Sequence, residues 1–161
     1  MTLPSAALAA IVAFVLMEPV TYAAHRWVMH GAGERLHRSH HRAVPEPGWE
    51  ANDWFPVIFA GLVMAVLAIG FNLPGAAVAI PVCVGVTAYG AVYALVHDVY
   101  IHGRLPLFGG RRVGLLDRLA DAHRIHHLYN GEPYGMLVPV VPRELRHRAA
   151  ATARDPFTRS A

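Results

Sequence analysis

Histidine is the residue type in this sequence whose pattern most directly indicates chemistry. Eleven histidines occur, and ten of them fall in four short clusters with a repeated spacing. The clusters read HxxxxH, HxxHH, HxxxxH and HxxHH along the chain, so one pair of patterns occurs twice. We call these clusters the histidine boxes; they contain His25 and His30; His37, His40 and His41; His97 and His102; and His123, His126 and His127.

The spacing within the boxes predicts a metal centre. Neutral imidazole is a ligand for zinc, copper, iron and nickel, so the residue type alone does not select the metal. On a helix, each HxxHH box can present three imidazoles to one side. Residues five apart lie about 140° apart on an ideal helix, so an HxxxxH pair can hold one ion only where the helix ends or distorts, and otherwise serves two ions. Ten imidazoles suit two ions, with five nitrogens each, or with four each and open positions for oxygen and water.

A single histidine near a membrane surface is more often a polar anchor than a metal ligand. Ten histidines at repeated spacing make that interpretation untenable for the set as a whole. His147 lies outside every box, in a polar segment near the end of the chain, and we expect it to be a solvated residue without a role in the site.

The elements that must position the boxes are apolar helices. The chain is 55% hydrophobic and 16% charged, and its basic residues are all arginine. No acidic or basic residue lies between Trp54 and Val96, and about 20 residues suffice for a helix to cross a bilayer. We therefore predict spans at about 54–71 and 75–97, joined by a turn at 72–75, with Pro81 kinking the later one. A first span at about 3–24, retained in the protein, contains Glu18 as its only charge.

The order of these spans predicts the topology. Three spans place residues 25–53 and 98–161 on the same side of the membrane, and all fourteen arginines lie in those two segments. The positive-inside rule puts that side in the cytoplasm, with the N-terminus outside the cell membrane. Arginines that flank apolar segments indicate topology and not binding to nucleic acid. One cysteine, Cys83, excludes an internal disulfide.

The sequence thus predicts an all-α integral membrane bundle: one domain over residues 1–161, with about three transmembrane helices and a di-metal centre on its cytoplasmic side. The boxes occupy residues 25–41 and 97–127, and 143–161 form a polar tail. A fourth, shallow or re-entrant segment near 136–141 is an alternative, although Pro139 and Pro142 argue against a full span.

Three carboxylates are candidates for orienting ligand histidines, by accepting a hydrogen bond from the ring nitrogen that does not bind the metal. Glu18 lies seven residues before His25, two turns earlier on the same helix face, and ionisable residues inside spans tend to be functional. It either orients a histidine or pairs with an arginine at the interface. Asp53 and Asp98 can likewise accept a ring N–H, and Asp98 is favoured because it adjoins His97.

With these patterns in place, the sequence resembles the bacterial carotenoid 3-hydroxylases (β-carotene hydroxylases) of the fatty acid hydroxylase/sterol desaturase superfamily. The resemblance covers about residues 15–130 and rests on the segments 18–31, 37–41, 52–53, 89–90, 95–98 and 122–127. It implies a non-haem di-iron centre that uses O2 and two electrons to hydroxylate C3 of β-ionone rings, taking β-carotene through β-cryptoxanthin to zeaxanthin. It also implies an electron donor such as ferredoxin with its reductase. Zinc can replace iron on purification. Residues 130–139 depart from the family pattern, which leaves the exact carotenoid open.

Other classes explain the pattern less well. A related di-iron hydroxylase or desaturase acting on a fatty acyl chain or a sterol is the nearest alternative. A metal transporter needs polar ligands along its spans, and residues 54–96 contain none that is charged. A haem protein needs only paired axial histidines.

Overall fold

The computed structural model describes residues 1–42 and 48–152. Within those ranges the chain forms helices and loops and contains no strand. Three helical stretches are long and apolar enough to cross a membrane, namely Leu3–Ala32, Ala51–Asn72 and Ala79–Ile101. The prediction of an all-helical fold with three possible spans is therefore confirmed.

Two of these stretches change their helix type before they end. An α-helix gives way to a π-helix at the end of the first stretch and at the end of the third. In chain order the elements are α1 (Leu3–Ala23), η1 (Ala24–Ala32), α2 (Glu34–His37), η2 (Ala51–Asp53), α3 (Trp54–Asn72), α4 (Ala79–Ala94), η3 (Leu95–Ile101), α5 (Gly114–Tyr129) and α6 (Arg143–Ala150).

The turn between α3 and α4 is longer than the predicted turn at 72–75. It moves the start of α4 close to Pro81, the position of the predicted kink. Gly75 adopts a φ of +84° in this turn, a value that favours glycine, and α4 begins only at Ala79. Pro81 consequently lies in the first turn of α4, where its missing N–H has no helical partner to lose. The kink predicted at Pro81 is wrong for this reason.

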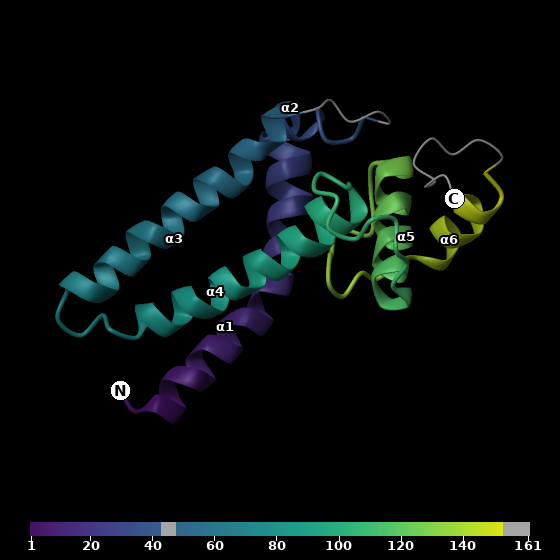
Figure 1. Cartoon of the computed structure of the whole chain (residues 1–161). Helices are drawn as coiled ribbons and strands as arrows, with labels where there is room; N and C mark the ends of the chain where they lie inside the picture. The colour runs from purple at the N-terminus through teal and green to yellow at the C-terminus, as the bar shows by residue number, and fades with distance from the viewer. Residues whose placement is uncertain (43–47, 153–161) are drawn as a thin grey trace.

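Helix α4 lies between α1 and α3 and packs on both (Figure 1). The contact with α1 is close because Gly85 has no side chain. A Cβ at Gly85 would overlap the carbonyl oxygen of Ala10 and lie 3.0 Å from the Cβ of Ala13. Small residues that let helix backbones approach are typical of membrane bundles, where apolar packing must replace the hydrophobic effect.

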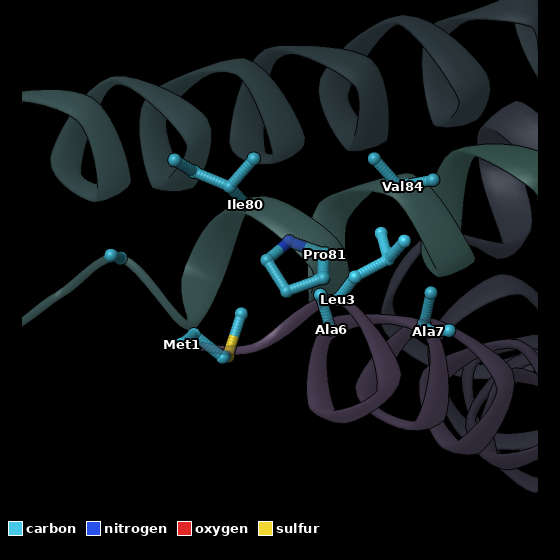
Figure 2. Close-up of a pocket in the computed structure, with 9 residues that line it drawn as sticks. Met1, Leu3, Ala6, Ala7, Ile80, Pro81 and Val84 are labelled. Atoms are coloured by element: carbon cyan, nitrogen blue, oxygen red, sulfur yellow. The ribbon is translucent and has the colours of Figure 1, made fainter.

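The outer faces of the three long helices are apolar and exposed, as expected for surfaces that meet lipid. Leu62, Met64 and Phe71 on α3 are each more than 60% exposed. An open apolar groove of about 400 Å³ lies between the start of α1 and the start of α4, lined by residues such as Leu3, Ala6 and Pro81 (Figure 2). This groove is at the opposite end of the bundle from the histidines and is lined only by apolar side chains, so it has no means of catalysis.

The remaining helices gather at the other end of the bundle, away from the N-terminus (Figure 1). Helix α5 packs on η3, and a buried tyrosine fastens the two together. Tyr100 donates its hydroxyl hydrogen to Asp117 (2.6 Å) and accepts a hydrogen bond from the backbone N–H of Val113 (2.9 Å). Asn130 ends α5 in the left-handed conformation, with a φ of +52°.

The chain after α5 forms a loop and then a further short helix. Residues 131–142 form a loop and not a full membrane-spanning helix, and backbone N–H groups in this loop bind a side chain from α1, as described below. Part of the predicted polar tail is the helix α6, which packs on α5 through the buried Ala149. His147 is exposed on α6. The rest of the tail, residues 153–161, lies outside the described residues.

Candidate metal centre

The π-helical segments explain how an HxxxxH box can act as one unit. A π-helix has i→i+5 hydrogen bonds, so residues five apart lie on nearly the same side of the helix instead of 140° apart. In η3 the backbone N–H of His102 donates to the carbonyl oxygen of His97 itself (2.9 Å). Segment η1 contains His25 and His30 in the same way. Of the two arrangements that the sequence left open, the structure shows the distorted helix.

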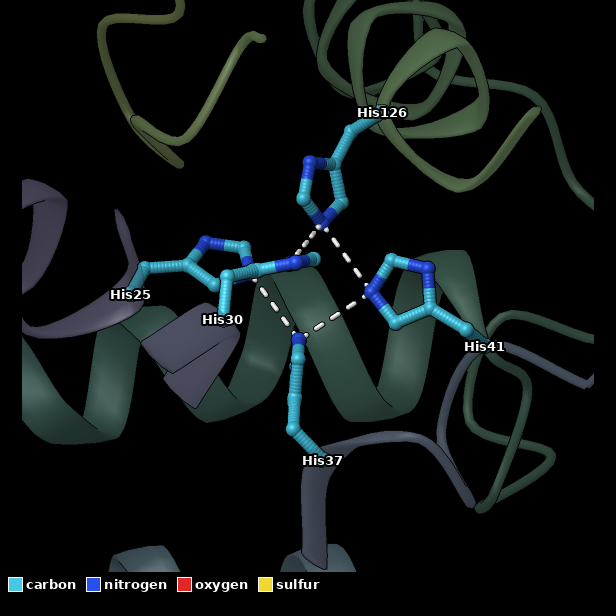
Figure 3. A group of neighbouring side chains, drawn as sticks. All are labelled: His25, His30, His37, His41 and His126. Atoms are coloured by element: carbon cyan, nitrogen blue, oxygen red, sulfur yellow. Dashed lines mark hydrogen bonds between the residues drawn. The ribbon is translucent and has the colours of Figure 1, made fainter. Parts of the chain in front are cut away.

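Nine of the boxed histidines form two groups in space. The candidate ligand atoms within each group lie within 4.8 Å of one another. The first histidine group consists of His25, His30, His37, His41 and His126 (Figure 3). The second histidine group consists of His40, His97, His102 and His123. The tenth, His127, lies beside the second group, with its Nε2 2.9 Å from that of His123.

Each HxxHH box contributes to both groups. His37 and His41 lie in the first group, and His40, between them in the sequence, lies in the second. This occurs because α2 ends at His37 and the following residues form a turn. In α5, His126 joins the first group and His123 joins the second. Each HxxHH box therefore bridges two positions and does not serve a single ion with all three rings.

The ring nitrogens of the first group face one another in a way that fits a bound cation. His25 donates its Nδ1–H to the carbonyl oxygen of Tyr134 (3.0 Å), and His37 donates its Nδ1–H to Oδ1 of Asn52 (2.7 Å). A neutral imidazole carries one N–H, so the Nε2 of each ring has only a lone pair. Those two Nε2 atoms are 3.1 Å apart. Two lone pairs at this distance repel unless a positive ion lies between them.

The spacing of the nitrogens also fits a metal. Nitrogens bound at about 2.1 Å to one ion lie about 3.0–3.4 Å from each other when their bonds diverge by about 90–110°. The Nε2 of His126 lies 3.2 Å from that of His30 and 3.2 Å from that of His41. In the second group, the Nε2 atoms of His102 and His123 are 3.1 Å apart. Both groups thus have the dimensions of an imidazole metal site.

Burial keeps these rings in the form that binds metal. Removal from water lowers the pKa of His37 to about 2 and that of His41 to about 3, from an ordinary value of 6.5. Burial also lowers the pKa of His123, His126 and His127. These histidines are therefore neutral at physiological pH, and no proton must leave before a metal binds.

The three carboxylates singled out in the sequence have different partners. Asp98 contacts Nδ1 of His97 (3.3 Å), the contact that was favoured for it. Asp53 does not contact a boxed histidine through its recorded hydrogen bonds; both of its oxygens accept hydrogen bonds from Arg104. Among the described residues, Glu18 neither contacts His25 nor pairs with an arginine; it binds Tyr89 of α4 and backbone N–H groups of the loop after α5.

The side chain of Glu18 binds the backbone of that loop. Its carboxylate accepts hydrogen bonds from the backbone N–H groups of Met136 (3.0 Å), Leu137 (3.2 Å) and Val138 (2.9 Å) and from the hydroxyl of Tyr89 (2.6 Å). The same loop supplies the carbonyl oxygens that accept from Nδ1 of His25 and of His126. Glu18 therefore reaches the first histidine group through the loop.

Four further contacts to boxed histidines were not assigned from the sequence, although Asn52 lies in one of the segments on which the family resemblance rests. Tyr134 and Gly131 act through backbone oxygens, which any residue possesses. Asn52 and Glu50 lie before α3, and the Nδ1 of His40 is 3.3 Å from a carboxylate oxygen of Glu50. A polar residue shortly before an apolar span is common, so its type and position alone could not distinguish these two.

An all-helical membrane fold that holds two clusters of buried and half-buried imidazoles is compatible with a metal centre in a membrane protein. Comparison with known families agrees with that class. The profile described as "Fatty acid hydroxylase" matches residues 10–144, which is most of the chain. The chain belongs to the fatty acid hydroxylase family and is an oxidoreductase.

Within that family, the chain is similar to proteins that bear a more specific name. A "Beta-carotene hydroxylase" of Pseudescherichia vulneris is 38% identical over 84% of this chain and 78% of its own length. One of Pantoea ananas is 39% identical over 78% of this chain and 70% of its own length. The chloroplastic "Beta-carotene 3-hydroxylase 1" of Arabidopsis thaliana is 35% identical over 76% of this chain and 40% of its own length. The resemblance inferred from the histidine boxes is confirmed. No solved structure matches this one significantly.

Proposed function

We propose that this protein is a membrane non-haem di-iron hydroxylase that acts on carotenoids, at C3 of the β-ionone ring. The observation that carries the proposal is the convergence of nine histidines from four boxes into two groups, with the tenth, His127, beside the second group. The names of the similar proteins support the substrate. The sequence of products would be β-carotene, β-cryptoxanthin and zeaxanthin.

The metal positions are the two histidine groups. Two bound iron ions would supply the activation of O2, with two electrons, and the removal of hydrogen from an unreactive C–H bond. The protein's own residues bind and orient. The Nε2 atoms converge, while Tyr134, Asn52 and Gly131 hold the rings of His25, His37 and His126 from behind. Burial of the rings excludes water from the reaction.

A lipid-soluble substrate has a direct route to such a site. Segment η1 carries His25 and His30 toward the first group, and it also carries Trp27 and Val28, which are 65% and 50% exposed. An apolar surface next to the histidines allows a ring dissolved in the hydrocarbon layer to approach sideways. The substrate therefore need not pass through water.

Electrons must arrive from the polar side. Three spans place η1 and η3 on one side of the membrane, and we assign that side to the cytoplasm of the cell membrane, with the N-terminus outside, from the distribution of arginines. Arg111, Arg112 and Arg118 are exposed beside or on α5. A positive surface attracts an acidic electron donor such as ferredoxin, itself reduced by its reductase.

The description of the family favours one alternative, hydroxylation of a fatty acyl chain. A sterol is a related possibility for the same chemistry. Both alternatives use the same metal centre and differ only in the substrate that reaches it.

Expression of the full chain in cells that make β-carotene tests the proposal, with pigments separated by chromatography and membrane lipids analysed in parallel. We expect mono- and dihydroxylated pigments. His126→Ala removes a fully buried ring of the first group, and loss of a ligand should reduce the product at least tenfold to a hundredfold. His147→Ala, at an exposed position in α6, should match the wild type. Unchanged β-carotene together with hydroxylated fatty acids or sterols would refute the carotenoid assignment.

A further inference from the structure

The two histidine groups differ in the chemical nature of the atoms that contact the Nδ1 side of their rings. In the first group, the recorded acceptors of Nδ1–H are neutral. They are the carbonyl oxygen of Tyr134 for His25, the carbonyl oxygen of Gly131 for His126, and the amide oxygen of Asn52 for His37.

In the second group, the corresponding acceptors are carboxylates. An oxygen of Glu50 lies 3.3 Å from Nδ1 of His40, and an oxygen of Asp98 lies 3.3 Å from Nδ1 of His97. The Nε2 atoms of these two histidines are 2.9 Å apart. Both negatively charged residues therefore stand behind rings that face the same position.

Arg104 lies close to both carboxylates and is itself held by Asp53. Its guanidinium lies 3.8 Å from Glu50 and 3.7 Å from Asp98, while both oxygens of Asp53 accept hydrogen bonds from it. Three carboxylates around one arginine carry a formal net charge of −2. The second histidine group thus has an excess of negative charge next to it.

The carboxylates on the side of the first group are engaged elsewhere. Glu18 binds backbone N–H groups and Tyr89. Glu132 pairs with Arg26 (2.9 Å) and accepts from the hydroxyl of Tyr22. Glu34 pairs with Arg38 at the surface. In addition, the buried Nδ1 of His41 has no hydrogen-bond partner among the described residues, so its ring is less firmly oriented.

A carboxylate behind a ligand histidine raises the basicity of the imidazole and fixes its orientation, and such partners typically change metal affinity tenfold to a hundredfold. Negative charge close to a divalent cation adds to the attraction. We propose that the two metal positions are unequal: the second histidine group binds its ion more tightly, and Glu50 and Asp98 are the positioning residues responsible. This inference rests on the proposed di-metal centre.

Zinc titration of the full chain tests it. The purified protein, in detergent, is stripped with a chelator and titrated with Zn²⁺ alone against a competing chromogenic chelator. We expect two steps whose dissociation constants differ at least tenfold. His97→Ala should remove the tighter step, and His41→Ala should remove the weaker one. The opposite assignment would overturn the proposal.

Three conservative variants separate this inference from a general structural role. Glu50→Gln and Asp98→Asn should each weaken the tighter step tenfold to a hundredfold and leave the weaker step unchanged. Asn52→Asp places a carboxylate behind His37 and should strengthen the weaker step, a gain that a misfolded protein cannot produce. Glu144→Gln, on the exposed surface of α6, is the matched control.

The outcomes distinguish this inference from the proposed function. Two zinc steps that Glu50→Gln, Asp98→Asn and Asn52→Asp all leave unchanged would overturn the inequality and keep the di-metal centre. Binding of well under one zinc per chain would refute the di-metal centre itself. Helical content measured by circular dichroism identifies any variant that fails to fold.

Discussion

Glu18→Gln tests whether a carboxylate inside a membrane-spanning helix controls the metal centre through a loop. Glu18 accepts hydrogen bonds from three backbone N–H groups and from the hydroxyl of Tyr89. A glutamine offers one oxygen as acceptor, and its NH2 group faces donors it cannot bind. We expect the loss of about two of the four hydrogen bonds.

The size of the effect follows from the charge of the acceptor. A hydrogen bond to a charged group contributes about 1.5–3 kcal/mol. Because Glu18 is only half-buried, its neighbours can shift and recover part of what is lost. We therefore expect Glu18→Gln to lower the free energy of unfolding by about 2–4 kcal/mol. Tyr89→Phe, which removes one of the four bonds, should cost about 1–2 kcal/mol.

The loop should transmit this change to the first histidine group, since its carbonyl oxygens hold His25 and His126. Thermal unfolding in detergent measures the stability, and the zinc content of the purified chain measures the site. Glu144→Gln on α6 is the control for loss of a surface carboxylate. A Glu18→Gln protein with unchanged unfolding temperature and full zinc content would refute the reasoning. Lower stability with full zinc content would limit Glu18 to a structural role.

Two further predictions concern the helix contact and the buried rings. Gly85→Ala should destabilise the protein by about 1–3 kcal/mol, because the new methyl group overlaps Ala10 and forces α1 away from α4. Gly90→Ala in the same helix, where a Cβ meets nothing within 4 Å, should be neutral or stabilising; equal unfolding temperatures for the two variants would contradict the close contact. The metal-free protein should lose stability as the pH falls below about 6.5, because His37 and His41, with pKa values of about 2 and about 3, take up protons only on unfolding. Each such histidine contributes up to about 1.4 kcal/mol per pH unit, so a flat stability profile between pH 7.5 and 5.5 would show that these rings are not buried in solution.

The sequence was sufficient for the parts of this molecule that depend on local patterns. The repeated histidine spacing indicated a clustered centre, and the absence of charge between Trp54 and Val96 indicated two helices. Both depend on residue types at short separations, which a single sequence displays directly. The family resemblance followed from the same short segments.

The division of the histidines into two groups could not be predicted, because it depends on contacts between distant residues. His40 meets His97, and His30 meets His126, across long stretches of chain. The π-helical segments could not be predicted either. The HxxxxH spacing was equally compatible with a helix that ends at the box or with two histidines that bind different ions. Glu18 was recognised as unusual within a span. Most of its partners are backbone N–H groups, which nearly every residue has, so the sequence could not identify them.

The continuity of α1 into η1, and of α4 into η3, has a consequence for where the chemistry takes place. The helical stretches that are long enough to cross a membrane contain His30, near the end of η1, and lead directly into His102, which follows η3. The number of residues in each stretch therefore sets how far these histidines lie from the lipid. Each residue added to the α-helical part of such a stretch would move the histidines by about 1.5 Å along the helix axis and rotate them by about 100° around it. For the proposed lipid-soluble substrate, the length of these helices would determine which of its atoms comes within reach of the histidines.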